Sequence, residues 1–184
     1  SKPFMAVNAE AQALLRELMN IPDNYSVLFV QGGASQQFAA VPLNLLKNGK
    51  ADYLVTGNFA KKAYEEGTKF GDMAIAASSA DKNHTYIPDM NSVKFRDGID
   101  YVHFCYNNTI FGTRFTDLPK TDATLVTDMS SCILSQEVDV SKFGLIYAGA
   151  QKNVAPAGLT IVIVKKDLLG KASPNCPTML NYAI

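Results

Sequence analysis

Phe143-Gly144-Leu145-Ile146-Tyr147-Ala148-Gly149-Ala150-Gln151-Lys152-Asn153 is the segment that says most about the architecture of this 184-residue chain. Its first part, Phe143 to Ala148, is an apolar run that predicts a buried strand, and a second such run, Leu159 to Val164, follows soon after. Lys152 is therefore expected at the end of a strand, among small residues and amides. That position suits an amine that forms an imine better than a charge that only keeps the chain soluble.

An acidic residue occupies the corresponding place one strand earlier. The apolar run Ala123 to Thr127 ends in Asp128, and Met129-Ser130-Ser131 follow. A lysine and an acid at strand ends of one sheet are the two groups that a pyridoxal phosphate enzyme needs, because the lysine holds the aldehyde as a Schiff base and the acid keeps the ring nitrogen protonated. Taken by itself, Asp128 before two serines is also typical of a helix N-cap.

Strands and helices alternate along the rest of the chain. Strands are predicted at Val27–Val30, Tyr53–Thr56, Met73–Ala77 and Tyr101–Cys105, and helices at Asn8–Asn20, Ser35–Lys47 and Ala60–Phe70. One face of the first helix carries the apolar residues Ala11, Leu14, Leu15 and Leu18. The run Val27–Val30 is typical of a strand covered on both faces, and the polar stretch Ser78–Asp100 predicts a loop with one helical turn. The alternation predicts a single α/β domain with a mostly parallel sheet.

Composition narrows the functional classes. Seventeen basic and seventeen acidic residues cancel, which predicts neither a nucleic-acid nor a membrane partner. No stretch approaches 18 uninterrupted apolar residues, and the start of the chain lacks the layout of a signal peptide, so a cytoplasmic protein is expected. Three widely spaced cysteines, Cys105, Cys132 and Cys176, predict reduced thiols. No metal site is expected, since His84 and His103 lack the spacing of metal ligands.

Several motifs, taken together and in order, resemble phosphoserine aminotransferase. They are Gln31-Gly32-Gly33-Ala34-Ser35-Gln36-Gln37-Phe38, Asp128-Met129-Ser130-Ser131 and Gly149-Ala150-Gln151-Lys152-Asn153, with Leu14 to Pro22 near the start and Cys176 to Leu180 near the end. The resemblance therefore runs through essentially the whole chain. It covers only the central part of such an enzyme, whose N-terminal segment, remaining large domain and small C-terminal domain have no counterpart here.

The resemblance implies a fold, an activity and an assembly. The fold is the three-layer large domain of fold type I pyridoxal phosphate enzymes, a mostly parallel sheet with helices on both faces. The activity is reversible amino transfer between glutamate and 3-phosphohydroxypyruvate, giving phosphoserine and 2-oxoglutarate in serine biosynthesis. The assembly is a cytoplasmic homodimer in which the partner subunit completes each phosphate site. This chain alone is expected to be inactive, because the family's substrate arginines and cross-subunit ligands lie in segments that it lacks.

The resemblance also assigns roles to individual residues. Lys152 would hold the cofactor covalently, and Asp128 would pair with its ring nitrogen. The turn Gly32-Gly33-Ala34-Ser35 joins a strand to a helix start, where free backbone N–H groups can receive a phosphate. In the family, the positions of Ala34 and Ser35 bind the cofactor phosphate. Without the resemblance, a double glycine in a strand-to-helix turn is weak support for that role.

Three further cofactor contacts follow from the resemblance. Phe59 stands where the family commonly has a tryptophan stacked on the cofactor ring, so the flat apolar face is kept but the indole N–H is lost. Thr109 matches a threonine whose hydroxyl reaches the cofactor's phenolic oxygen, and Gln151 matches a residue that contacts the phosphate. Each of these could instead be structural, and Asn107-Asn108 is better explained by turn chemistry than by catalysis.

Other interpretations stay open at this point. None of the arginines, Arg16, Arg96 and Arg114, matches a substrate-binding arginine of the family, and a solvated role is expected for Arg114. The chain could be another fold type I enzyme, of the alanine–glyoxylate aminotransferase or cysteine desulfurase type, although Cys176 is a poor candidate for a mobile catalytic thiol. It could also be a folded fragment that binds no cofactor. A nucleotide-binding module is disfavoured, because Gly32-Gly33 does not extend into a glycine-rich phosphate loop.

Overall fold

A computed structural model describes residues 1–184 of the chain. Its α-helices are α1 (Lys2–Leu18), α2 (Gly33–Leu45) and α3 (Asn58–Gly67). Its strands are β1 (Tyr25–Val30), β2 (Lys50–Val55), β3 (Asp72–Ser78), β4 (Tyr101–Cys105), β5 (Asn107–Asn108), β6 (Thr113–Arg114), β7 (Thr124–Asp128), β8 (Leu145–Gly149) and β9 (Thr160–Lys165). Short 3-10 turns occupy Ala80–Lys82, Val140–Lys142, Lys166–Leu168 and Thr178–Leu180. The predicted strands and helices are thus confirmed, with ends shifted by a few residues.

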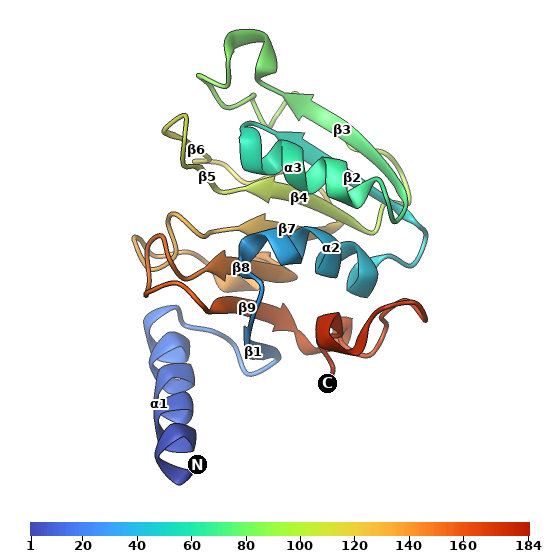
Figure 1. Cartoon of the computed structure of the whole chain (residues 1–184). Coiled ribbons are helices and arrows are strands. Elements are labelled where there is room, and N and C mark those ends of the chain that lie inside the picture. Colours follow the sequence, from blue (N-terminus) through green and yellow to red (C-terminus); the bar gives the residue numbers. More distant parts are fainter.

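Seven strands form one mixed sheet in the order β1-β9-β8-β7-β4-β2-β3 (Figure 1). Strand β9 pairs antiparallel with both of its neighbours, and the other six strands share one direction. The predicted mostly parallel sheet is therefore confirmed. Because parallel strands end at the same edge, the segments that follow β1, β2, β4, β7 and β8 all gather at the left edge in Figure 1.

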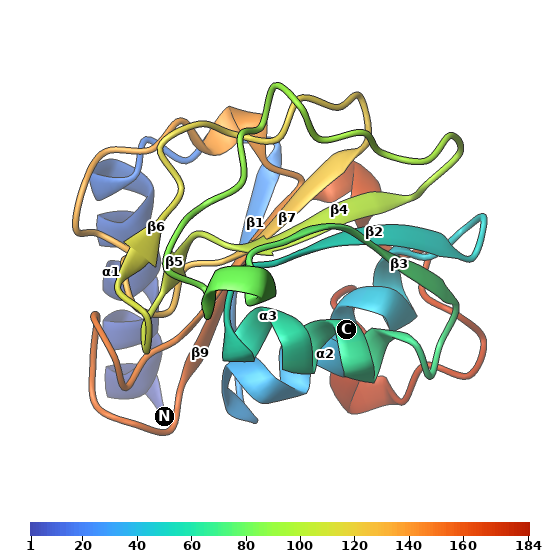
Figure 2. The ribbon, with the colours of Figure 1, turned by 90° about the horizontal axis from the view of Figure 1, so that it is seen from above.

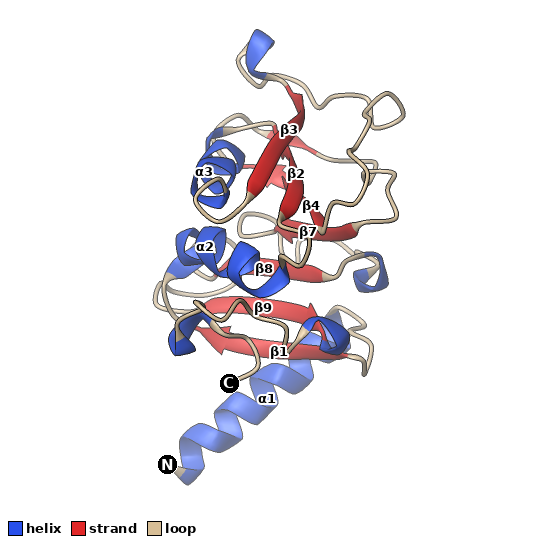
Figure 3. Cartoon of the chain, turned by 90° about the vertical axis from the view of Figure 1, so that its right-hand side faces the viewer, coloured by secondary structure: helices blue, strands red, loops and turns tan.

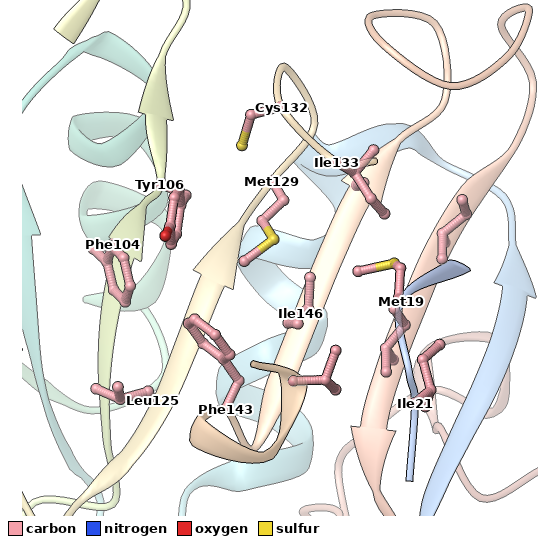
Figure 4. Close-up of a cluster of buried hydrophobic side chains, with 14 of the residues drawn as sticks. Met19, Ile21, Phe104, Tyr106, Leu125, Met129, Cys132, Ile133, Phe143 and Ile146 are labelled. Carbon is pink, nitrogen blue, oxygen red and sulfur yellow. The ribbon is translucent and has the colours of Figure 1, made fainter. Parts of the chain in front are cut away.

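The two faces of the sheet are covered differently. Helices α2 and α3 lie together on one face (Figures 2 and 3), above a buried cluster that includes Phe38, Tyr53 and Tyr147. The C-terminal end of α1 and the long irregular connections cover the other face. There Met19 and Ile21 pack in one cluster with residues such as Phe143, Ile146 and Met129 (Figure 4). The chain thus has the expected three layers with helices on both faces.

Helix α1 departs from the sequence expectation. It begins at Lys2 rather than at Asn8, since Pro3 is well tolerated in the first turn of a helix. Of the predicted apolar face, only Leu15 is buried, while Leu14 and Leu18 are 48% and 63% exposed. The reason is the placement of the helix, which reaches the core only with its C-terminal end and extends beyond β1 (Figure 3).

Strand β1 was expected to be covered on both faces, and this is only partly right. Tyr25 and Val27 are buried, but the residues from Leu28 to Val30 are half-buried. The strand lies at the edge of the sheet and pairs only with β9, so fewer neighbours cover it. The polar stretch from Ser78 to Asp100 is irregular with one short 3-10 turn, as predicted. No helix of the chain combines the length and hydropathy of a membrane-spanning helix.

Candidate active site

The segments that follow four parallel strands meet in one recess at the carboxyl edge of the sheet. Phe59 comes after β2, Thr109 after β4, Asp128 at the end of β7 and Lys152 after β8, and all four line this recess. Strand register sets part of the arrangement, because Cys105, Asp128 and Tyr147 are aligned across β4, β7 and β8. Four of the seven site residues predicted from the sequence are therefore brought together by the fold.

The Lys152 amino group points back over the recess. Its Nζ donates a hydrogen bond to Thr109 Oγ1 at 2.9 Å and lies 4.0 Å from the centre of the Phe59 ring. The residue itself is exposed and follows the tight end of β8, where Gly149 and Ala150 are fully buried. The backbone before the lysine is thus anchored, while the long side chain stays free to change its direction.

Asp128 is held in the opposite way. Its residue is 6% exposed, and burial raises the pKa of the carboxyl, an effect that hydrogen bonds from Ser130 and the nearby charge of Lys152 oppose. Oδ1 accepts hydrogen bonds from the backbone N–H of Ser130 at 2.9 Å and from the Ser130 hydroxyl at 2.6 Å. The bond from the residue two positions onward is the pattern by which an aspartate caps a turn, so the capping interpretation and the recess position hold together.

A short hairpin carries Thr109. Strands β5 and β6 flank its turn, and the buried side chain of Asn108 ties the hairpin to the end of β2. Asn108 Nδ2 donates to Thr56 Oγ1 at 3.0 Å and to Thr113 Oγ1 at 3.1 Å, and Thr56 donates to Asn108 Oδ1 at 3.2 Å. A Cβ at Gly57 would lie 2.8 Å from Asn108 Oδ1, so only glycine fits there. The turn role expected for Asn108 is seen in its carbonyl, which accepts hydrogen bonds from the N–H groups of Phe111 and Gly112, while its side chain adds the tertiary contacts.

Phe59 forms a flat apolar wall of the recess from the start of α3. The recess is narrow, with a volume of about 10 Å³, because the Lys152 amino group lies on the ring face. Because the Lys152 side chain is exposed, it is free to leave the face of the Phe59 ring. The cation–π contact between the two residues is weak enough, at about 0.5–1 kcal/mol for exposed groups, to permit that movement.

The start of α2 lies beside this recess rather than in it. Gly32 and Gly33 have φ values of +93° and +67°, which glycine adopts without strain, and they bring the chain into the helix. A Cβ at Gly149 would lie 3.3 Å from the Ala34 nitrogen, so the helix start approaches the end of β8 closely. Ser35 and Gln151 are exposed. None of the three predicted phosphate contacts, Ala34, Ser35 and Gln151, lines the recess itself.

Some residues at the site were not singled out from the sequence. Ser130 bonds to Asp128, and only its place two residues after an acid hinted at this role. The expectation that Arg114 is solvated is only partly right, because the residue is half-buried, one of its terminal nitrogens is buried without a hydrogen-bond partner, and its guanidinium lies 5.6 Å from the centre of the Tyr106 ring. Arg114 pairs with Asn107 in the hairpin, a non-local arrangement that the residues next to it in the sequence do not reveal.

The three cysteines are free thiols, as expected. Cys105 lines the recess, and burial raises its pKa well above the ordinary value. Burial also raises the pKa of Cys132 to about 11 and that of the half-buried Cys176. At neutral pH these thiols are therefore protonated and poor nucleophiles.

Comparisons with known proteins agree with this geometry. The family model of the class-V aminotransferases matches residues 1–178. A curated phosphoserine aminotransferase of Bacillus thuringiensis subsp. konkukian is 55% identical over 184 residues, which are 99% of this chain and 51% of that protein. The chain thus spans about half the length of the curated relatives that it matches.

Solved structures give the same result. Phosphoserine aminotransferase from Bacillus circulans subsp. alkalophilus superposes with a TM-score of 0.94 at 45% identity, covering 99% of this chain and 51% of that one. The PLP-bound phosphoserine aminotransferase from Trichomonas vaginalis superposes with a TM-score of 0.93 at 37% identity, covering 99% and 55% of the two chains. The sheet, the recess and the sequence agree on one family, and this chain belongs to the class-V aminotransferases.

Proposed function

We propose that this chain is the cofactor-binding core of a phosphoserine aminotransferase and that its cofactor is pyridoxal phosphate. The observation that carries the proposal is the convergence of an amine, an acid and a flat ring in one recess. Lys152 Nζ lies 2.9 Å from Thr109 Oγ1 and 4.0 Å from the centre of the Phe59 ring, and the Asp128 carboxyl opens into the same space.

The residues around the recess are chemically suited to this cofactor. The Lys152 amine would hold its aldehyde, the Thr109 hydroxyl would face its phenolic oxygen, and Phe59 would face its ring. Asp128 would pair with the ring nitrogen through Oδ2, which takes no hydrogen bond within the chain and is not fully buried. The first N–H groups of α2, at Ala34 and Ser35 beside the recess, would supply part of a phosphate site, because the positive end of a helix dipole favours an anion.

The bound cofactor would supply an electron sink for the bonds at a substrate's α-carbon. The residues of the chain supply the rest. Asp128 would face the cofactor ring nitrogen with a carboxyl group that, when ionised, favours a proton on that nitrogen. Lys152 Nζ, on a side chain that can reach both Thr109 and the recess, is the group placed to take and return the α-proton. Phe59 would stack against one face of the ring and exclude water from it.

The relatives named phosphoserine aminotransferase support the choice of substrates. We infer that the complete protein exchanges an amino group between glutamate and 3-phosphohydroxypyruvate, as a cytoplasmic homodimer. Residues 1–184 lack the family's substrate arginines, and the neighbours Gln151 and Ser35 offer only part of a phosphate site. The inference is therefore that this chain binds the cofactor but turns over little substrate without the rest of the family's architecture.

Cofactor binding is the sharpest test. Incubation of the chain with pyridoxal phosphate should give a visible absorbance band, and borohydride reduction followed by peptide mapping should find the label on Lys152. Pyridoxamine phosphate, which lacks the aldehyde, serves as the control and should leave no label. A label spread over the exposed lysines, or none at all, would contradict the proposal.

Substrate choice is tested separately. Phosphoserine with 2-oxoglutarate should give a rate near background for this chain and a measurable rate for a protein of the relatives' full length that contains it. Alanine with glyoxylate is the comparison for the alternative aminotransferase, and release of sulfide from cysteine is the comparison for a desulfurase. The raised thiol pKa values disfavour the desulfurase. Preference of the longer protein for alanine would contradict the assignment of phosphoserine.

A further inference from the structure

Ser130 connects the acid of the recess to the strand that leads to the lysine. It lies two residues after Asp128 and is 2% exposed. Its hydroxyl donates to Asp128 Oδ1 at 2.6 Å and accepts a hydrogen bond from the Gly149 N–H at 2.9 Å. Gly149 is the last residue of β8, three positions before Lys152. One buried hydroxyl thus bridges the ends of two neighbouring strands.

The direction of these hydrogen bonds is determined by chemistry. A backbone N–H can only donate, so the Ser130 oxygen must accept from Gly149. The Ser130 hydrogen is then left for the carboxylate of Asp128, which can only accept when ionised. Donor and acceptor roles polarise each other in such a chain of hydrogen bonds, which strengthens the bond to the carboxylate.

Ser130 also decides which carboxylate oxygen faces the recess. Its N–H and its hydroxyl both bond to Oδ1, at 2.9 Å and 2.6 Å. Oδ2 takes no hydrogen bond within the chain and is not fully buried. Rotation about the Cβ–Cγ bond of Asp128 would break both short bonds, so the carboxylate presents a single oxygen to a ligand in the recess.

We propose that Ser130 is a positioning residue that orients Asp128, stabilises its carboxylate form through two hydrogen bonds and couples it to the end of β8. The proposal rests on the proposed function only in that the partner of Oδ2 would be the ring nitrogen of pyridoxal phosphate. The contacts of Ser130 with Asp128 and Gly149 stand without it.

Apart from Lys152, the titratable groups around Asp128 are kept neutral by their burial. Cys105 on β4, Tyr147 on β8 and Cys132 after β7 interact electrostatically with the carboxyl, and burial raises the pKa of each. They are therefore neutral near pH 7. The charge of Lys152 and the two bonds from Ser130 favour the ionised carboxylate, against the effect of burial.

The test titrates the Asp128 carboxyl in the cofactor-free chain, by carbon NMR of labelled aspartate with Asp128→Asn for assignment. Ser130→Ala should raise the proton affinity of the carboxyl roughly tenfold, the usual effect of losing one hydrogen bond to a charged group. Ser130→Thr should restore most of the original titration. The control is Ser135→Ala. Ser135 lies in the same connection, and its hydroxyl bonds only to the Cys132 carbonyl, so this substitution should leave the titration of Asp128 unchanged.

The outcomes separate the two proposals. An unchanged Asp128 titration in folded Ser130→Ala overturns the role of Ser130. If that variant does not fold, Ser130→Cys, which keeps the size but has a weak donor, decides in the same way. Binding of pyridoxal phosphate should weaken several-fold in Ser130→Ala. Failure of the unaltered chain to bind pyridoxal phosphate refutes the proposed function, and the titration still reports on Ser130.

Discussion

Asp128 and Lys152 meet at one recess but are held in opposite ways. Asp128 ends a central strand, is buried and has one oxygen tied by two hydrogen bonds. Lys152 lies in the exposed connection between β8 and β9 and makes one hydrogen bond, to Thr109, through a long side chain. The acid is therefore preorganised by the sheet, whereas the amine can move.

The difference matches the two tasks that the proposed function gives to these residues. A charge that stabilises a cofactor through every step is most useful when it does not have to reorganise. An amine that is attached, displaced and then used for proton transfer must change its position between steps. Burial and register provide the first property, and exposure after a strand end provides the second. Substitution of Asp128 and substitution of Lys152 should therefore have different effects on stability and on cofactor binding.

The largest effect on cofactor binding is expected from substitution of Lys152. Lys152→Ala should abolish the band and the borohydride-trapped label with pyridoxal phosphate completely, while the free energy of unfolding changes by only about 0.5 kcal/mol, as is usual for exposed positions. Urea denaturation and mass spectrometry measure the two quantities. Lys62→Ala, which removes a lysine 6.0 Å from the centre of the same Phe59 ring, is the matched control and should keep the label.

The stability of the sheet that carries Asp128 should be sensitive to acid because of the buried residue His103. His103 is 2% exposed and its Nε2 lies 2.8 Å from the Tyr147 hydroxyl, and burial lowers its pKa to about 3. An unfolded histidine titrates near pH 6.5, so between pH 6.5 and 3 the unfolded chain binds one proton more and stability falls with acid. From pH 6.5 to 5 this amounts to about 2 kcal/mol. His103→Gln should remove that part of the loss in urea titrations, and an identical pH dependence in both chains would show that His103 is not responsible.

A smaller effect is expected from the acid itself. Because burial raises the pKa of Asp128 above its unfolded value, the carboxyl favours the folded state fully only below pH 4, and that contribution is lost as the pH rises through the folded value. Asp128→Asn should therefore raise the free energy of unfolding at pH 7 and leave it nearly unchanged at pH 3. The same variant should bind pyridoxal phosphate more weakly. Asp117→Asn, at an exposed position, should show neither change.

The smallest effect concerns the wall of the recess. Phe59→Trp should tighten the binding of pyridoxal phosphate by a factor of about 2 to 5, since a larger ring adds about 0.5–1 kcal/mol of stacking. The chain contains no tryptophan, so the one introduced by this substitution reports binding through the quenching of its fluorescence. Phe59→Leu, which keeps the apolar character without the flat face, should weaken binding, and equal affinities in all three chains would exclude stacking.

Much of the fold was predictable because it depends on local patterns. The apolar runs that became β4, β7, β8 and β9 are short, β-rich and bounded by polar residues, so periodicity places them within a residue or two. The positions of α1 and β1 were harder to judge. The sequence predicted that both elements form but overestimated their burial, because burial depends on neighbours that the pattern does not contain and both elements lie at the border of the sheet.

At the site, too, some features follow from neighbouring residues and others depend on contacts between distant segments. The identities of Lys152 and Asp128, and their places at strand ends, follow from residues next to them in the chain. The bridge from Ser130 to Gly149 spans 19 residues, the network of Asn108 with Thr56 spans 52, and the contact of Lys152 with Thr109 spans 43.

The sequence by itself determined which residues end each strand and therefore which chemical groups reach the carboxyl edge. Only the tertiary structure decided which of those groups touch, how deeply Asp128 is buried and that Arg114 turns inward. The physical reason is that strand formation responds to the polarity of adjacent residues, whereas contacts and burial arise from the order and register in which distant strands pair.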